Sequence, residues 1–393
     1  MGAGADHGVG RAAVVMDLTL SADELAFRDE FRAWIADHHP GSPPSNVEER
    51  YYWRLEWLRE LNRGGFAAMH WPSEFGGRGA TAMLNAVFFI ELARAGAPIP
   101  ANHIATFMAG PTIMQWGTVE QKERYLAPML RADNVWCQGF SEPGAGSDLA
   151  AVATFAARDG DEFVVNGQKV WTSEAQYAHF CLLVTRTDRS VAQHKGLTYF
   201  ILDMSSPGIT RRPLRQLTGE SEFNELFFDN VRIPASSVVG EVGNGWRVAM
   251  TTLMHERSMI GAGYGIRLRN YLTVVEEHLR AHGLLSDPVV ADRFADLEIR
   301  TRALELSALR QISEAQARGS VGSEGSILKL MWSETYSRLA EFAIETVGPD
   351  ALEDGSGWAW EYLRSRASTI EGGTSDILRN IVADRILGLP RAR

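Results

Sequence analysis

The segment Ser141-Glu-Pro-Gly-Ala-Gly-Ser-Asp148 carries residue types that could hold a ligand rich in carbonyl and phosphate oxygens. Gly144 and Gly146 have no side chains, so backbone N–H groups there could approach a ligand closely and act together as anion donors. Ser141 and Ser147 place hydroxyl donors beside them. Taken alone, the segment also fits an ordinary turn.

A second segment, Ile370-Glu-Gly-Gly-Thr-Ser-Asp376, precedes a helical pattern. The free N–H groups and the positive end of that helix would face any ligand above the segment. Thr374 or Ser375 also fits the role of a helix N-cap, which is compatible with ligand binding. Both segments therefore offer backbone donors to a ligand.

The third candidate is the carboxylate at position 256. Glu256 belongs to an apolar helical stripe that consists otherwise of Ala249, Leu253, Ile260 and Gly263. Burying a carboxylate is unfavourable unless it is paired with a cation or used in chemistry. Two interpretations follow, an ion pair with Arg257 or another cation, and a general base that accepts a proton.

Helical patterns dominate both ends of the chain. Ser21 with Glu24, and Thr118 with Gln121, form capping boxes at two predicted helix starts. Further helices are expected over residues 48–62, 81–95, 287–319, 326–348 and 375–387. Helices of this length with apolar stripes suggest that the C-terminal part is a bundle.

Between the helical parts the pattern changes to strands. Asn166-Gly167 stands between two β-prone runs, which predicts a hairpin turn. More strands are expected over residues 180–185, 197–202 and 226–229. We therefore expect an α+β multidomain fold. Its parts are a loose tail at 1–16, a helical domain at 17–135, a small β-barrel or sandwich domain at 136–239 and a four-helix bundle domain at 240–390.

The composition excludes several classes of function. The chain has 393 residues, a formal net charge of −10, 45% hydrophobic and 22% charged residues, which is typical of a folded multidomain protein. Because the Lys and Arg residues are scattered, we expect no nucleic-acid partner. The sequence contains no run of about 18 apolar residues, so we expect no membrane span. Cys137 and Cys181 are too few for a disulfide framework, which favours buried thiols in a reducing compartment such as the cytoplasm.

From about Asp17 to Pro390 the chain resembles the acyl-CoA dehydrogenase family. The segment 141–148 looks like that family's loop for FAD and CoA, and Asn166-Gly-Gln-Lys-Val-Trp171-Thr-Ser173 looks like its second flavin strand. The resemblance implies FAD as the cofactor, bound by Gln138, Phe140, Ser141, Gly146, Ser147, Trp171, Thr172, Ser173, Thr374 and Asp376. The substrate contacts that it implies are Ser147, Arg257 and the N–H group of Gly372.

Three of these positions have a more specific role in the family. Groups that match Ser141 and Ser173 hydrogen-bond the flavin near its reactive nitrogen, and the indole that matches Trp171 lies along the ring. A donor at that nitrogen favours the electron-rich reduced flavin. On its own, a tryptophan in a strand is also typical of a core aromatic residue.

The resemblance places the catalytic base at Glu256. Many family members carry the base as the Glu of a Glu-Gly-Thr triplet, but Gly372 stands at that position in this chain. Other members, including isovaleryl-CoA dehydrogenase-like enzymes, carry a Glu directly before an Arg on the first helix after the β domain, which matches Glu256-Arg257. Glu371, one residue from the usual position, is the second candidate.

The implied reaction is the FAD-dependent α,β-dehydrogenation of an acyl-CoA thioester to the trans-2-enoyl-CoA. Glu256 would take the α-proton, and the β-hydrogen would leave as a hydride to the flavin. The N–H group of Gly372 and a ribityl hydroxyl of the flavin would polarise the thioester carbonyl.

The implied partners are an electron-transfer flavoprotein and further subunits, in a homodimer, a homotetramer or a heterotetramer. Elements that reach a neighbouring subunit's FAD in the family are replaced here by Arg280-Ala-His-Gly and Glu345-Thr-Val-Gly-Pro, so those contacts stay open. The chain is similar to actinobacterial members, some of which act on sterol side chains or other bulky acyl groups. Two alternatives remain, a partner subunit that binds acyl-CoA without turnover and an oxidase that uses oxygen.

Overall fold

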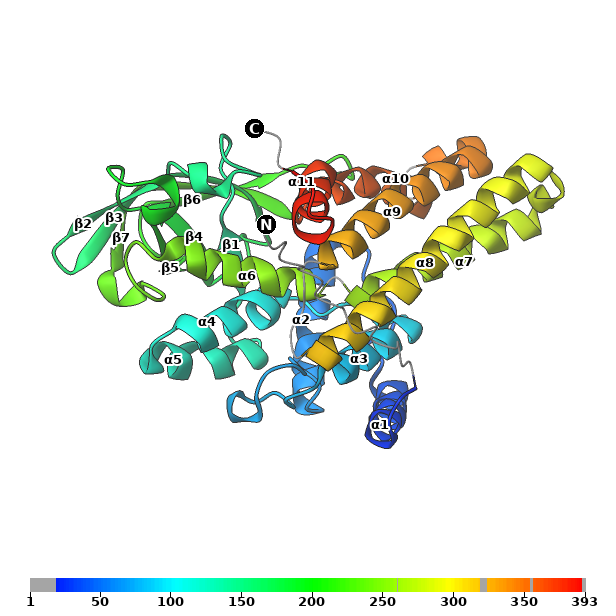
Figure 1. Ribbon diagram of the computed structural model, residues 1–393, viewed down its shortest axis with the longest axis horizontal. Helices are drawn as coiled ribbons and strands as arrows, with labels where there is room; N and C mark the ends of the chain where they lie inside the picture. The colour runs from blue at the N-terminus through cyan, green and yellow to red at the C-terminus, as the bar shows by residue number, and fades with distance from the viewer. Residues whose placement is uncertain (1–18, 260, 319–323, 354–355, 391–393) are drawn as a thin grey trace, which may run out of the picture.

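The computed structural model describes residues 19–259, 261–318, 324–353 and 356–390, with side chains except at 256–259, 261–262 and 315–318. The predicted tail at 1–16 lies outside the described residues. As Figure 1 shows, the described chain forms a helical region, a curled sheet and a second helical region, in that order. This order confirms the predicted α+β architecture. No helix of the described residues is long and apolar enough to cross a membrane.

The first helical region consists of α1 (Ala22–His38), α2 (Val47–Arg63), α3 (Ala82–Arg94), the π-helix η2 (Ala105–Ala109), α4 (Gly110–Trp116) and α5 (Val119–Leu130). Both predicted capping boxes are present. The Ser21 hydroxyl accepts from the Glu24 N–H and the Glu24 carboxylate accepts from the Ser21 N–H, and Thr118 and Gln121 repeat this arrangement. The apolar faces of these helices share one continuous core with the sheet.

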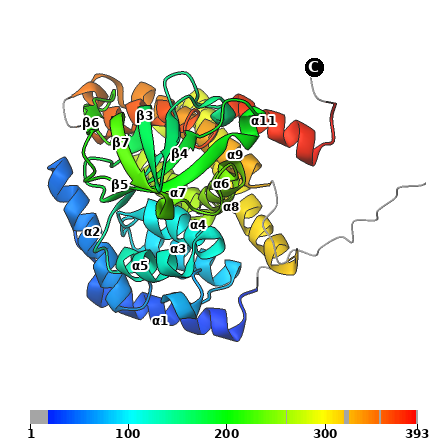
Figure 2. The same cartoon turned by 90° about the vertical axis from the view of Figure 1, so that its left-hand side faces the viewer.

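The middle region is a sheet of seven strands, with the order β1-β4-β2-β3-β7-β6 and with β5 paired to β4 outside this path. The strands are β1 (Trp136–Gly139), β2 (Phe155–Asp159), β3 (Glu162–Ser173), β4 (Phe180–Arg186), β5 (Leu197–Asp203), β6 (Ile209–Leu214) and β7 (Phe223–Pro234). Figure 2 shows the strands above the N-terminal helices. Parallel pairing of β1 with β4 places Cys137 beside Cys181, and both are buried free thiols, as predicted.

The predicted hairpin turn at Asn166-Gly167 is wrong. Both residues lie inside the long strand β3, and the tight turn from β2 to β3 is at Gly160 and Asp161 instead. The register against β7 shifts at this point, because Asp229 and Asn230 of β7 both stand opposite Asn166. A Cβ on Gly167 would lie 2.6 Å from Thr154 Oγ1, and the φ of Gly167 is +148°. Close approach of a neighbouring segment therefore requires this glycine.

The second helical region contains α6 (Gly245–Met259), α7 (Gly261–Ala281), α8 (Pro288–Arg318), α9 (Gly325–Val347), α10 (Gly357–Ser368), α11 (Ser375–Ile381) and the π-helix η8 (Val382–Ile386). In Figure 1, α7, α8, α9 and α10 run alongside one another. They enclose a separate core that includes Leu272, Leu304 and Phe342. These helices confirm the predicted C-terminal bundle.

Candidate active site

A buried ion pair anchors the segment 141–148 to β3. Lys169 is fully buried, and its Nζ donates to Glu142 Oε1 at 2.8 Å and to the Phe140 carbonyl at 2.9 Å. Glu142 also accepts from the N–H groups of Ala153 and Thr154 at 2.6 and 2.9 Å. Burial alone would raise the pKa of Glu142, but the Lys169 ammonium and these donors hold it below its usual range. Burial lowers the pKa of Lys169 to about 8.

The segment 141–148 lies directly beside the end of β3. The N–H of Val170 donates to the carbonyl of Ser141 at 2.9 Å, so Ser141 is a neighbour of Trp171. A Cβ built on Gly144 or Gly146 would meet nothing within 4 Å. The packing of the chain therefore does not require glycine at these two positions, and the open space suits the close approach of a ligand.

The end of β3 presents an exposed aromatic face next to polar groups. Trp171 is 59% exposed, has a φ of +58°, and touches Phe223 edge-on with ring centroids 6.0 Å apart. This exposure argues against a core role for the indole. Thr172 is buried, and its Oγ1 has no partner among the described residues, while Ser173 is partly buried. Positive φ in a residue other than glycine costs about 1–3 kcal/mol and clusters at ligand sites.

Two glycines and one lysine shape the C-terminal loop. The lysine was not among the residues predicted from the sequence. Gly372 and Gly373 have φ values of +62° and +99°. Lys329 of α9 is 2% exposed and donates from Nζ to the Gly373 carbonyl at 2.8 Å. Thr374 caps α11, since its hydroxyl accepts from the Ile377 N–H at 3.2 Å. The helix-cap interpretation of Thr374 is therefore confirmed.

Asp376 lies in the first turn of α11 and is largely exposed. Its carboxylate accepts from Arg379 at 3.1 Å on the same helix. Gln138 lies in β1, and Phe140 directly follows that strand. The contacts of these three residues with FAD stay predictions.

Glu371, the second candidate for the base, is held by a guanidinium. Arg364 of α10 donates to both carboxylate oxygens of Glu371, at 3.0 and 3.1 Å. Burial raises the pKa of Glu222, and the positive charge of the nearby Arg364 opposes part of this rise. The Glu222 carbonyl accepts from the Glu174 N–H at 2.7 Å, next to Ser173. The C-terminal loop therefore lies near the end of β3, and the pairing of Glu371 with Arg364 makes Glu371 the weaker candidate for the base.

Buried hydroxyl contacts fix the helix that carries Glu256. The Thr252 hydroxyl of α6 lies 3.0 Å from the Tyr199 hydroxyl of β5 and 2.9 Å from the Thr112 hydroxyl of α4. These contacts hold α6 between the sheet and the N-terminal helices. Position 256 follows Thr252 by one helical turn, while the side chains of Glu256 and Arg257 lie outside the described part of the structure.

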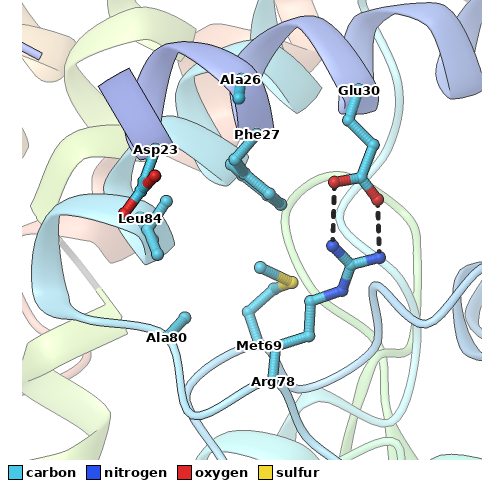
Figure 3. A pocket seen from close by; sticks show the side chains of 8 residues that line it. All are labelled: Asp23, Ala26, Phe27, Glu30, Met69, Arg78, Ala80 and Leu84. Carbon is cyan, nitrogen blue, oxygen red and sulfur yellow. Dashed lines mark hydrogen bonds and ion pairs between the residues drawn. The ribbon is translucent and has the colours of Figure 1, made fainter. Parts of the chain in front are cut away.

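A surface pocket of about 320 Å³ lies in the N-terminal region, away from the predicted site residues. Figure 3 shows that the Arg78 guanidinium and the Glu30 carboxylate pair at one side of it, at 2.9 and 3.2 Å. The lining residues are Asp23, Ala26, Phe27, Glu30, Met69, Arg78, Ala80 and Leu84. Because it contains none of the predicted site residues, we assign it no part in the reaction.

The comparisons with known proteins identify the family. Acyl-CoA dehydrogenase family models match residues 21–133 (N-terminal domain), 137–231 (middle domain) and 243–387 (C-terminal domain). The chain is 40% identical over 381 residues to the acyl-CoA dehydrogenase IpdE1 of Mycobacterium tuberculosis, which covers 94% of this chain and 98% of that protein. The chain therefore belongs to the acyl-CoA dehydrogenase family of flavoprotein oxidoreductases, which confirms the predicted family and enzyme class.

Two solved structures share the fold over nearly the whole chain. The Tcur3481-Tcur3483 steroid acyl-CoA dehydrogenase has a TM-score of 0.83 and 30% sequence identity, and covers 96% of this chain and 100% of its own. The ChsE4-ChsE5 complex from Mycobacterium tuberculosis has a TM-score of 0.82 and 30% identity, with the same coverage. The boundaries predicted for the domains, 17–135, 136–239 and 240–390, stay a prediction.

Two buried histidines of the N-terminal region lead to a prediction about acid stability. Burial lowers the pKa of His70 and of His103 to about 4. The nearby His255 lowers the pKa of His70 further, and the nearby Arg54 does the same for His103. Between pH 6.5 and pH 4 the unfolded chain binds more protons than the folded chain, so the free energy of unfolding falls as the pH falls. Each histidine is expected to contribute about 2 kcal/mol to the loss between pH 7 and pH 5.

Urea unfolding at pH 7 and pH 5 checks this expectation. The difference in unfolding free energy between the two pH values should shrink by about 2 kcal/mol in His103→Leu. His39→Leu, at an exposed position, should leave the difference unchanged. A His103→Leu variant with the wild-type pH dependence would contradict the assignment.

Proposed function

We propose that the protein catalyses the FAD-dependent α,β-dehydrogenation of an acyl-CoA thioester to the trans-2-enoyl-CoA and passes the electrons to an electron-transfer flavoprotein. The proposal rests on the observation that three predicted segments lie close together. The segment 141–148 contacts the end of β3, and the loop at Glu371 is linked to the same strand end through Arg364. The base helix α6 packs against both the sheet and the N-terminal helices.

The residues present fit FAD. A planar heteroaromatic ring with carbonyl groups suits the exposed Trp171 face, and the hydroxyls of Ser141 and Ser173 supply donors beside it. The unpartnered Thr172 Oγ1 is a further polar group at this strand end. FAD, when bound, supplies the acceptor for the β-hydrogen and its electron pair. The residues that we propose to hold it are Gln138, Phe140, Ser141, Gly146, Ser147, Trp171, Thr172, Ser173, Thr374 and Asp376.

The residues of the chain would handle the proton and the thioester. Glu256 accepts the α-proton as a carboxylate, while the electrons of that C–H bond form the double bond and the β-hydrogen departs as a hydride. The N–H of Gly372 donates to the thioester carbonyl and stabilises the charge that develops there. Lys329 fixes the carbonyl of the next residue, Gly373, and so holds the donor in place. Ser147 and Arg257 are the proposed contacts with the rest of the substrate.

We further propose that the chain assembles with other subunits in the cytoplasm, as a homodimer, a homotetramer or a heterotetramer with a second type of chain. Two structural relatives, the Tcur3481-Tcur3483 steroid acyl-CoA dehydrogenase and the ChsE4-ChsE5 complex, each pair two named chains and support such an assembly. The Glu345 carboxylate already pairs with Arg293 of its own chain at 2.6 Å, so a contact from Glu345 to a neighbouring subunit would compete with this pair. Native mass spectrometry distinguishes the three assemblies.

Anaerobic titration of the purified protein tests the proposed reaction. We expect a yellow protein with a flavin absorbance band and about one FAD per chain, and that band should bleach on addition of an acyl-CoA substrate. A panel of short, branched and steroid-tailed acyl-CoAs defines the chain preference. A colourless protein would instead support the non-catalytic partner subunit. Peroxide formation without an electron-transfer flavoprotein would support the oxidase.

A further inference from the structure

The backbone around Ser173, at the end of β3, adopts unfavourable angles on both sides of that residue. Trp171 has a φ of +58°, and Glu174, which directly follows Ser173, has a φ of +54°. Neither residue is a glycine, so these left-handed angles persist only where surrounding contacts enforce them. The contacts of Glu174 therefore help to decide where the Ser173 hydroxyl lies.

Contacts within the sheet region hold the backbone of the turn that begins at Glu174. The Glu174 N–H donates to the Glu222 carbonyl at 2.7 Å, and the Glu174 carbonyl accepts from the Tyr177 N–H at 3.0 Å. Gln176 of the same turn donates from Nε2 to the Ser221 carbonyl at 3.1 Å. These contacts involve only the backbone of Glu174, while its carboxylate interacts with a different region of the molecule.

The Glu174 carboxylate pairs with Arg54 of α2, in the N-terminal helical region. Arg54 Nη1 lies 3.5 Å from Glu174 Oε1, and Arg54 Nε donates to the Ile99 carbonyl at 3.2 Å. Tyr51 and Tyr177, whose rings stack with centroids 3.9 Å apart, line the same small cavity of about 30 Å³ as this pair. Because water has little access there, the two charges interact more strongly than in an exposed pair.

The charges around Glu174 make its carboxylate depend on Arg54. Burial raises the pKa of Glu174, and the positive charge of Arg54 opposes this rise. Arg364, a second cation near Glu222, is already bound to both carboxylate oxygens of Glu371. Without Arg54, the Glu174 carboxylate would be buried without its counter-charge, which favours a different arrangement of the turn.

We propose that Arg54 is a positioning residue for the flavin contact at Ser173, and that it acts through its ion pair with Glu174. The inference rests on the proposed function, because it concerns how this chain holds FAD. Ser173 is the proposed donor near the reactive nitrogen of the flavin, and a donor there favours the reduced state. A helix of the N-terminal region thereby sets how strongly the bound flavin prefers to be reduced.

The two-electron reduction potential of the FAD-loaded protein, measured without acyl-CoA, tests this inference. Arg54→Met removes the charge and keeps a similar side-chain length. The loss of one well-placed hydrogen bond should lower the preference for reduced over oxidised flavin by about tenfold, which corresponds to a fall of about 30 mV. Arg54→Lys keeps the positive charge and should recover part of the potential. The visible flavin band and FAD per chain are recorded for every variant.

Glu174→Gln should lower the potential in the same direction. The double variant Arg54→Met/Glu174→Gln should shift it no further than the larger single change, because both changes remove the same ion pair. Arg50→Met is the matched control, since Arg50 lies one turn earlier in α2 and pairs with Glu220 instead. It should leave the potential unchanged.

A wild-type potential in Arg54→Met with FAD bound would overturn the inference, as would additive shifts in the double variant or an equal shift in Arg50→Met. If Arg54→Met does not fold, Glu174→Gln and Arg54→Lys decide, because a wild-type potential in Glu174→Gln contradicts the role of the pair. Failure of the proposed function is distinguishable. It appears in the wild-type protein as missing FAD or as a flavin that no acyl-CoA bleaches, whereas failure of the inference appears in the comparison of variants.

Discussion

Replacing Glu256 by glutamine is expected to lower acyl-CoA turnover by about a thousandfold while FAD stays bound. A positioned general base contributes roughly 10²–10⁴ in rate, and the amide cannot accept the α-proton. The flavin band of Glu256→Gln should therefore bleach little when substrate is added anaerobically. The measurements are FAD per chain, the amplitude and rate of bleaching, and steady-state turnover with an electron acceptor.

Glu371→Gln is the matched control for that experiment. Glu371 is tied to Arg364 by two hydrogen bonds, so its amide variant should weaken the loop and keep most of the turnover. If Glu371→Gln loses turnover and Glu256→Gln retains it, then Glu371 is the base. Full activity in both variants would exclude both carboxylates as the base.

Much of the fold could be predicted from local patterns. The capping boxes at Ser21 and Thr118 are local signals in which one side chain satisfies free N–H groups of its own helix, and both are present. The hairpin prediction failed because Asn-Gly is typical of any site that needs unusual backbone angles. At Gly167 that need comes from contact with Thr154, which is 13 residues earlier in the chain and cannot be seen in a short window.

The candidate site also contains residues that could be predicted from the sequence and residues that could not. The glycines and hydroxyls of 141–148 and Trp171 are recognisable because they form contiguous motifs. The groups that position them are separated in sequence, as in the pairs of Arg364 with Glu371 and of Lys329 with the Gly373 carbonyl. Such pairs depend on which helices become neighbours. A charged residue within an apolar stretch, such as Lys329 in α9, was the available signal for a buried structural role.

The buried pair of Glu142 and Lys169 gives the second large expected effect. Glu142→Gln should lower the free energy of unfolding by about 3–5 kcal/mol, because removal of one partner leaves the other buried without a counter-charge. The pair links the segment 141–148 to β3, the strand that carries Trp171 near its end, so FAD occupancy should fall as well. Urea unfolding and FAD per chain measure the two effects.

The double variant Glu142→Gln/Lys169→Met separates the effect of an unpaired buried charge from the effect of losing the side-chain contact between β3 and the segment 141–148. It leaves no ammonium to bury, so it should recover much of the stability lost in Glu142→Gln. FAD occupancy should recover less, because no side chain would then donate to the Phe140 carbonyl. Arg232→Met removes an exposed pair with Asp159 and Glu162 in the same sheet and should change neither quantity. Wild-type stability and FAD content in Glu142→Gln would show that the segment is held by its backbone contacts alone, such as the one between Val170 and Ser141.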